Sequence, residues 1–240
     1  IKLVRILKKK NADSTAEHEK IKSLVSDISH QLKTPLANLK MYTDFISDPD
    51  LDEQKRREYI RIISLSVDRL SFLSESMIKI SRLESGLIHL KSEELNLSET
   101  VLKAIKDVYS KAAKNGNEIV FKEENKVVIS HDRGWTAEAV FNLLDNAVKY
   151  SPKGGRVYVT VRKLGLFAEV EVKDEGDKIP ECEQPKIFSR FYRGSNSREK
   201  EGIGIGLYLA REIAIKQGGY INLKSSDKGN SFSLFLFQGE

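Results

Sequence analysis

The octapeptide Ser29-His30-Gln31-Leu32-Lys33-Thr34-Pro35-Leu36 lies inside a long helical pattern and is the starting point for predicting the fold of this 240-residue chain. Helical spacing brings His30 and Thr34, one turn apart, onto the same face. Pro35 has no N–H to bond the carbonyl of Gln31, so the helix is expected to loosen or kink there and leave the imidazole in solvent. A lone histidine on a helix surface means little by itself, because solvated histidines are common.

Two long amphipathic helices are expected around this octapeptide. The first runs from about residue 15 to 47 and ends at Asp48-Pro49-Asp50; the second runs from about residue 52 to 85 and ends at Gly86. At a rise of about 1.5 Å per residue, each helix is a rod on the order of 50 Å long. A hairpin of this length cannot bury its apolar stripe alone, whereas two hairpins paired as a four-helix bundle can. The pattern therefore predicts a homodimer.

From about residue 90 the pattern changes to strands alternating with helices. A mostly antiparallel sheet is predicted from strands at 119–121, 127–129, 157–161, 168–172, 220–223 and 231–237. Helices near 97–115, 135–150 and 205–217 are expected to cover one face of it. The predicted fold is an N-terminal helical hairpin that forms a dimeric four-helix bundle, then an α/β sandwich. The hairpin domain is assigned to residues 1–89, with 1–14 as a linker segment, and the second domain to 90–240.

A polar helix face is predicted in the decapeptide Asn142-Leu143-Leu144-Asp145-Asn146-Ala147-Val148-Lys149-Tyr150-Ser151. On a helix, Asn142, Asn146 and Lys149 share one face, so two carboxamides and an ammonium point the same way. Mg²⁺ prefers oxygen ligands, which suits the amide oxygen of Asn146 bridging to nucleotide phosphates. Lys149 would neutralise phosphate charge. The alternative is a buried helix with asparagine caps.

A carboxylate follows the predicted strand at 168–172, where Asp174-Glu175-Gly176 forms a glycine turn. Such a carboxylate can accept a hydrogen bond from the exocyclic amine of adenine. Guanine presents an acceptor at that place, and two facing acceptors repel. Asp174 is therefore predicted to select ATP over GTP, although Asp-x-Gly also occurs in many ordinary turns.

Alternate glycines open a helix in Gly202-Ile203-Gly204-Ile205-Gly206-Leu207. Glycines permit close backbone approach, and a helix N-terminus offers free N–H donors to phosphate. The spacing does not fit a dinucleotide fingerprint. Upstream, Phe188 and Phe191 are expected to anchor a lid at 195–201, with Arg193 reaching the γ-phosphate. A plain surface loop is the alternative for this polar lid.

Taken in chain order, these stretches resemble five motifs of the sensor histidine kinases of two-component systems. They are the phospho-acceptor box at 29–36, the N box at 142–151, the D box at 174–176, the F box around Phe188 and Phe191, and the G box at 202–207. The resemblance covers nearly the whole chain. The resemblance implies ATP-dependent autophosphorylation of His30, transfer to an aspartate on the receiver domain of a response regulator, and phosphatase activity towards that regulator. The side-chain oxygen of Gln31 would accept a hydrogen bond from the imidazole of His30 and so orient it. Thr34 would orient a water that removes phosphate from the regulator. ATP and Mg²⁺ are the implied cofactors, with Asn146 as metal ligand. The implied nucleotide site comprises Asn142, Asn146, Lys149, Tyr150, Asp174, Gly176, Ile179, Phe191, Tyr192, Arg193, Gly202, Ile203, Gly204, Ile205, Gly206 and Leu207.

Two other functions remain open. A nucleotide-binding scaffold with weak or lost kinase activity is suggested by two departures from the family pattern, Gln31 in place of an acidic residue and Lys178 in place of a second glycine. A gyrase-like ATPase shares the fold. In those ATPases a glutamate activates water where this chain has Asn142, and because an amide cannot take that proton, transfer to His30 is favoured.

Composition and charge limit the partners. The net charge of +5 is modest, and the one basic run, Lys8-Lys9-Lys10, has no interleaved aromatics, so no nucleic-acid partner is expected. A single cysteine, Cys182, fits a reducing compartment. His18, His89 and His131 are interpreted as surface residues. The sequence has no apolar run long enough to cross a membrane. The basic run at residues 8–10 is typical of a segment next to a membrane on its cytoplasmic side. We therefore expect this chain to be the cytoplasmic portion of a sensor that is anchored in the inner (cell) membrane through a segment absent here.

Overall fold

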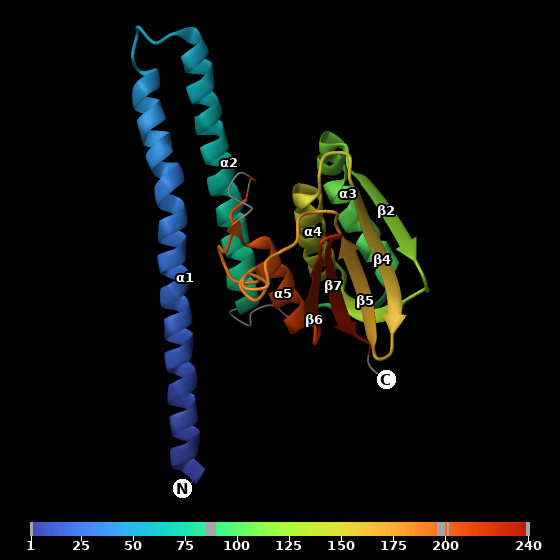
Figure 1. Cartoon of the computed structure of the whole chain (residues 1–240). Helices are drawn as coiled ribbons and strands as arrows, with labels where there is room; N and C mark the ends of the chain where they lie inside the picture. The colour runs from blue at the N-terminus through green and yellow to red at the C-terminus, as the bar shows by residue number, and fades with distance from the viewer. Residues whose placement is uncertain (1, 85–89, 196–199, 201, 239–240) are drawn as a thin grey trace. The chain divides into compact units, whose positions relative to one another are not determined.

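The computed structural model describes residues 2–84, 90–195, 200 and 202–238, with side chains from residue 22 onward. The chain divides into two compact units, Ile1–Met77 and Ile78–Glu240. Figure 1 shows that the first is helical and that the second carries the sheet. The predicted boundary between 89 and 90 adjoins residues outside the described part, as do the expected helix end at 85 and Gly86, so these stay predictions.

Two helices form the hairpin: α1 spans Lys2–Ile46 and α2 spans Glu53–Glu84. Helix α1 begins well before residue 15, because the segment ahead of it contains four lysines, two leucines and Arg5, which are good helix formers, and no proline or glycine. It also continues through Pro35, which is buried. The expected loosening therefore does not interrupt the helix, although the carbonyl of Gln31 still lacks its usual N–H partner.

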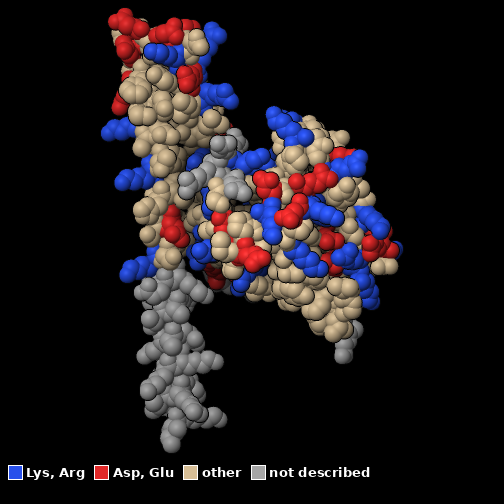
Figure 2. All heavy atoms as spheres, in the orientation of Figure 1, with Lys and Arg blue, Asp and Glu red and all other residues tan. Residues whose placement is uncertain are grey.

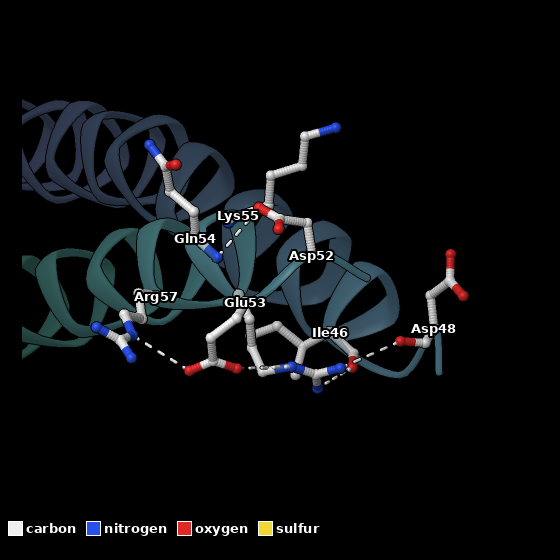
Figure 3. Close-up of polar contacts among 8 residues, drawn as sticks. Ile46, Asp48, Asp52, Glu53, Gln54, Lys55 and Arg57 are labelled. Atoms are coloured by element: carbon white, nitrogen blue, oxygen red, sulfur yellow. Dashed lines mark hydrogen bonds and ion pairs between the residues drawn. The ribbon is translucent and has the colours of Figure 1, made fainter. Parts of the chain in front are cut away.

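The turn between α1 and α2 is held by polar contacts at both helix ends (Figure 3). Asp52 Oδ2 accepts hydrogen bonds from the backbone N–H groups of Gln54 and Lys55, at 3.1 and 3.3 Å. Such a cap satisfies N–H groups that have no partner within the helix. Arg56 Nη1 donates to the carbonyl oxygen of Ile46 at 3.0 Å, at the end of α1. The turn is thus fixed by its own side chains.

The main sheet has five strands in the order β2-β4-β5-β7-β6. Only β2 and β4 are parallel, so the expectation of a mostly antiparallel sheet is confirmed. The strand bounds are β2 Glu118–Glu123, β4 Arg156–Leu164, β5 Phe167–Lys173, β6 Tyr220–Ser226 and β7 Gly229–Phe237.

A separate two-stranded sheet joins β1 (Ser92–Asn96) to β3 (Val128–Asp132). The strand expected at 127–129 therefore lies outside the main sheet, contrary to the prediction. Strand β1 was not predicted, because Ser92-Glu93-Glu94-Leu95-Asn96 has neither apolar alternation nor β-branched or aromatic residues. Strand β1 is therefore stabilised by its backbone hydrogen bonds to β3 and not by a strand-forming sequence.

Helices α3 (Leu97–Asn115), α4 (Arg133–Tyr150) and α5 (Gly206–Lys216) cover one face of the main sheet, as expected (Figure 1). Helix α4 contacts both neighbouring helices and the sheet. Its Leu143, Leu144 and Val148 have no exposed surface, and neither do Val159 and Val170 of the sheet. Each such side chain contributes about 1.5–3 kcal/mol by leaving water. The polar face of α4 is therefore carried by a rigid, fully packed helix.

Two further findings concern single features. His131 is 1% exposed, so its interpretation as a surface residue is wrong; its Nδ1–H donates to the carbonyl of Ile129 at 3.0 Å, and its Nε2 accepts from the Thr100 hydroxyl at 2.9 Å. His89 and the side chain of His18 lie outside the described part. Within that part, no helix is both long and apolar enough to cross a membrane.

Burial lowers the pKa of His131 from its ordinary value of 6.5. Below about pH 6.5 the unfolded state binds a proton on this residue and the folded state resists it, so the free energy of unfolding should fall on acidification. The slope from one such group is at most about 1.4 kcal/mol per pH unit. His131→Gln should remove this part of the pH dependence between about pH 5 and 6.5. Urea unfolding followed by the fluorescence of Trp135 tests this, and equal slopes for both proteins would contradict it.

Candidate functional site

The first element of the site is the exposed face of α1 around His30. His30 and Thr34 are both exposed, one helical turn apart. Ser29 donates its hydroxyl back to the carbonyl of Val25 at 2.8 Å, so this neighbouring side chain is engaged with its own helix. The imidazole of His30 is therefore exposed to solvent, as the sequence predicted.

Gln31 has a partner that the sequence did not indicate. Its Oε1 accepts a hydrogen bond from Arg69 Nη2 of α2 at 3.3 Å. This is the oxygen expected to accept from the imidazole of His30. Arg69 lies 38 residues further along the chain, and no local pattern connects the two. The contact gives position 31 a cationic neighbour.

In the second unit, Lys149 of α4 lies beside the glycine-rich segment. A Cβ placed on Gly202 would be 2.7 Å from Lys149 Nζ, the mobile end of that side chain, so the Lys149 ammonium reaches this segment. Gly202 also has a φ of 134°, which other residues rarely adopt. The ammonium lies 4.7 Å from the ring centroid of Tyr150. Two segments predicted to bind nucleotide are thus brought together.

Asn142 lies against the start of α5. Asn142 is 9% exposed, and a Cβ on Gly206 would be 2.8 Å from its Oδ1. Ile205, the residue preceding the helix, makes no side-chain capping bond, so the first N–H groups of α5 have no side-chain acceptor there. Ile203 and Ile205 are buried, whereas Leu207 and Asn146 are half-buried. This helix N-terminus is suited to an anionic ligand.

Asp174 is 2% exposed and is held through one oxygen. Its Oδ1 accepts from the N–H of Gly176 at 2.8 Å, and from the backbone and side-chain nitrogens of Asn230 at 3.3 and 3.0 Å. Burial raises the pKa of Asp174, against the effect of these bonds. Oδ1 thus holds the carboxylate in place, while Oδ2 takes no part in these three bonds. A fixed carboxylate oxygen of this kind is suited to accept a hydrogen bond from the amine of adenine.

Asn230 was missed in the sequence, and the strand pairing shows how it could be found. Lys173 of β5 is opposite Ser231 of β7, which sets Asp174 beside Asn230. The turn after Asp174 lies against α4, because a Cβ on Gly176 would be 2.8 Å from the carbonyl oxygen of Tyr150. Ile179 is half-buried, and its N–H donates to the Ser225 hydroxyl at 2.8 Å.

The segment before the predicted lid packs on the glycine-rich segment. A Cβ on Gly204 would be 2.5 Å from the carbonyl oxygen of Tyr192, and Phe191 has a left-handed φ of 60°. Arg193 Nη2 donates to the carbonyl oxygen of Lys200 at 2.6 Å, which links the two sides of the predicted lid. Residues 196–199 and 201 of that lid lie outside the described part.

Comparison with known proteins gives two family matches. Residues 20–86 match the His Kinase A (phospho-acceptor) domain, and residues 131–239 match the histidine kinase-, DNA gyrase B- and HSP90-like ATPase family. The signal transduction histidine-protein kinase/phosphatase MprB of Mycobacterium sp. (strain KMS) is 31% identical over 226 residues, 90% of this chain and 42% of that protein. The chain thus spans less than half the length of this curated relative.

Solved structures share the fold. The histidine kinase AdeS of Acinetobacter baumannii is similar with a TM-score of 0.72 at 20% identity, over 88% of this chain and 98% of that one. The histidine kinase ThkA, solved in complex with the response regulator protein TrrA, has a TM-score of 0.74 at 21% identity, over 90% of this chain and 61% of that one.

The phospho-acceptor match covers the exposed His30 and the ATPase match covers α4, Asp174 and the glycine-rich start of α5. The chain belongs to the sensor histidine kinases of two-component systems.

Proposed function

We propose that this chain transfers the γ-phosphoryl group of ATP to His30, and then to an aspartate on the receiver domain of a response regulator. The observation that carries the proposal is the assembly of Asp174, Lys149 and the N-terminus of α5 on one unit, with an exposed histidine on the other. The names of the relatives support it, since MprB is described as a kinase/phosphatase and ThkA was solved with a response regulator.

Three groups of this chain have the chemistry to hold the nucleotide. Asp174 would accept from the exocyclic amine of adenine, the N–H groups at the start of α5 would donate to phosphate, and Lys149 would neutralise phosphate charge. Tyr150, Gly176, Ile179, Tyr192 and Arg193 would line the same site. Asn146, half-buried one turn after Asn142, offers an amide oxygen suited to Mg²⁺, which when bound would neutralise charge on the phosphates.

The acceptor helix supplies the nucleophile. The ring nitrogen of an imidazole carries a lone pair that can attack a phosphorus atom, so His30 has the chemistry of an acceptor. Thr34, which is exposed one turn away, would orient a water that removes phosphate from the regulator. Catalysis would rest mainly on alignment and charge neutralisation, as is general for phosphoryl transfer.

A second copy of the chain would complete the helical unit. The hairpin carries large apolar side chains that are exposed in one copy, and Figure 2 shows largely uncharged surface along it. These side chains include Val25, Leu36, Met41, Phe45, Ile60, Leu65, Val67 and Phe72. Soluble proteins rarely leave so much apolar surface in water, which supports a four-helix bundle of two hairpins. The run Lys8-Lys9-Lys10 supports a parent protein with a membrane anchor and this chain on the cytoplasmic side.

The first test is labelling with γ-labelled ATP. Wild-type protein should acquire an acid-labile label, because phosphohistidine is lost in acid and phosphoserine is not. His30→Ala should abolish labelling and keep nucleotide affinity, since acceptor and nucleotide site lie on separate units. Ser29→Ala is the matched control and should label normally. Label retained on His30→Ala would exclude this acceptor, and nucleotide binding without any label would favour the scaffold alternative.

Asp174→Asn tests adenine recognition separately from folding. The new amide keeps an oxygen that can accept from Gly176 and Asn230 and removes a buried charge, so the melting temperature should equal or exceed that of wild type. The side-chain nitrogen of the new amide would, however, face the adenine amine, so that two hydrogen-bond donors would oppose each other. ATP affinity should drop by about tenfold or more, as for a mismatched buried hydrogen bond, and GTP should gain relative to ATP. Calorimetry with both nucleotides measures this, and an unchanged ATP-to-GTP ratio would contradict the assignment.

Gln31→Glu tests the proton acceptor for His30. A carboxylate at this position can take the imidazole proton, and general bases contribute typically about 10²–10⁴-fold. Arg69 would pair with the new carboxylate, lower its pKa and weaken it as a base. We therefore expect single-turnover labelling at saturating ATP to be faster in Gln31→Glu, and faster still with Arg69→Gln added. Arg69→Gln alone is the control. A double variant no faster than the single would show that Arg69 has no such effect.

A further inference from the structure

Glu138 and Asn142 lie one turn apart on α4 and are joined by two hydrogen bonds. Asn142 Nδ2 donates to the backbone carbonyl of Glu138 at 2.8 Å and to its carboxylate Oε1 at 3.3 Å. A carboxamide nitrogen has two hydrogens, so both find an acceptor on the same residue. The backbone bond is available to any residue at position 138, whereas the second bond depends on the side chain.

The carboxamide of asparagine has two nearly equivalent orientations, because its terminal torsion is broad and roughly two-fold. Exchanging oxygen and nitrogen at Asn142 would set its oxygen against both acceptors of Glu138. That arrangement places acceptor against acceptor, and Asn142 is 9% exposed, so water can compensate little. The pair of bonds therefore fixes one orientation.

In the observed orientation Oδ1 faces the start of α5. A Cβ on Gly206 would be 2.8 Å from this oxygen, and no side chain of Ile205 caps the helix there. Asn142 thus presents an acceptor at the phosphate end of the proposed site. An acceptor cannot bond phosphate oxygens, which are also acceptors, but it suits a metal-bound water or another donor that accompanies the nucleotide.

We propose that Glu138 is a positioning residue that selects the orientation of Asn142 and so keeps its Oδ1 directed at the donors that accompany bound nucleotide. The inference rests on the proposed nucleotide site and adds a residue to it.

Glu138 also contacts Lys79 in the described part of the chain, and this contact requires a control. Lys79 Nζ lies 2.8 Å from Glu138 Oε1, the same oxygen that accepts from Asn142. Both residues belong to the unit Ile78–Glu240. An effect of Glu138 variants through Lys79 would be reproduced by Lys79→Met, whereas an effect through Asn142 would not.

The experiment measures the affinity of the full chain for a non-hydrolysable ATP analogue by calorimetry, with Mg²⁺ and with EDTA. Glu138→Ala should weaken binding in Mg²⁺ by about three- to tenfold, the range for one hydrogen bond. Glu138→Gln keeps an acceptor oxygen, and Lys79→Met leaves Asn142 untouched, so both should stay within about twofold of wild type by the same measure. In an Asn142→Ala background, Glu138→Ala should have no further effect, because additivity fails for residues that act as a unit.

A second readout needs no nucleotide. The side-chain amide protons of Asn142, assigned by NMR from their loss in Asn142→Ala, should exchange with water faster in Glu138→Ala than in wild type and Glu138→Gln. Equal losses from Glu138→Ala in the wild-type and Asn142→Ala backgrounds, or unchanged amide exchange, would overturn the positioning role. Failure of wild-type protein to bind the analogue would instead overturn the nucleotide site, and with it this proposal.

Discussion

The close approach of two backbone segments to α4 is the constraint on which the nucleotide-binding unit depends. The turn at Gly176 and the start of α5 at Gly206 both lie nearer to α4 than a Cβ allows. Because α4 is anchored by fully buried leucine and valine side chains, these segments pack against a rigid surface. The polar groups proposed to bind adenine, phosphate and metal are therefore placed by packing, before any ligand arrives.

Much of this arrangement could be predicted from local sequence signals. Helix α3 has the bounds predicted for it, and the structure shows what sets them: Asn96 caps its start, with Oδ1 accepting from Ser98 N–H, and Gly116 ends it with a φ of 71°. The helical spacing of apolar residues predicted α4, and the alternation of apolar and polar residues predicted the strands of the main sheet. The chemical identity of the amide, carboxylate and glycine stretches indicated a nucleotide site, since few other ligands require this combination.

The missed features depend on contacts between distant residues. Strand β1 forms because β3 pairs with it, not because of its composition. Asn230 and Arg69 became visible as partners of Asp174 and Gln31 only once the fold was known. His131 is an instructive exception: two residues after buried Ile129 on β3, it lies on the same face, so strand alternation alone could have indicated burial.

The bond between Asp174 and Asn230 has a consequence for the order in which the protein matures. Asn230 lies on β7, whereas His30 lies about 200 residues earlier, in α1. During synthesis, domains generally fold as units from the N-terminus. A nascent chain that lacks β7 exposes the histidine while Asp174 still lacks the partner that orients it. The carboxylate proposed to recognise adenine is therefore oriented only once β7 has been made and has paired with β5, which is later than the synthesis of the helix that carries His30.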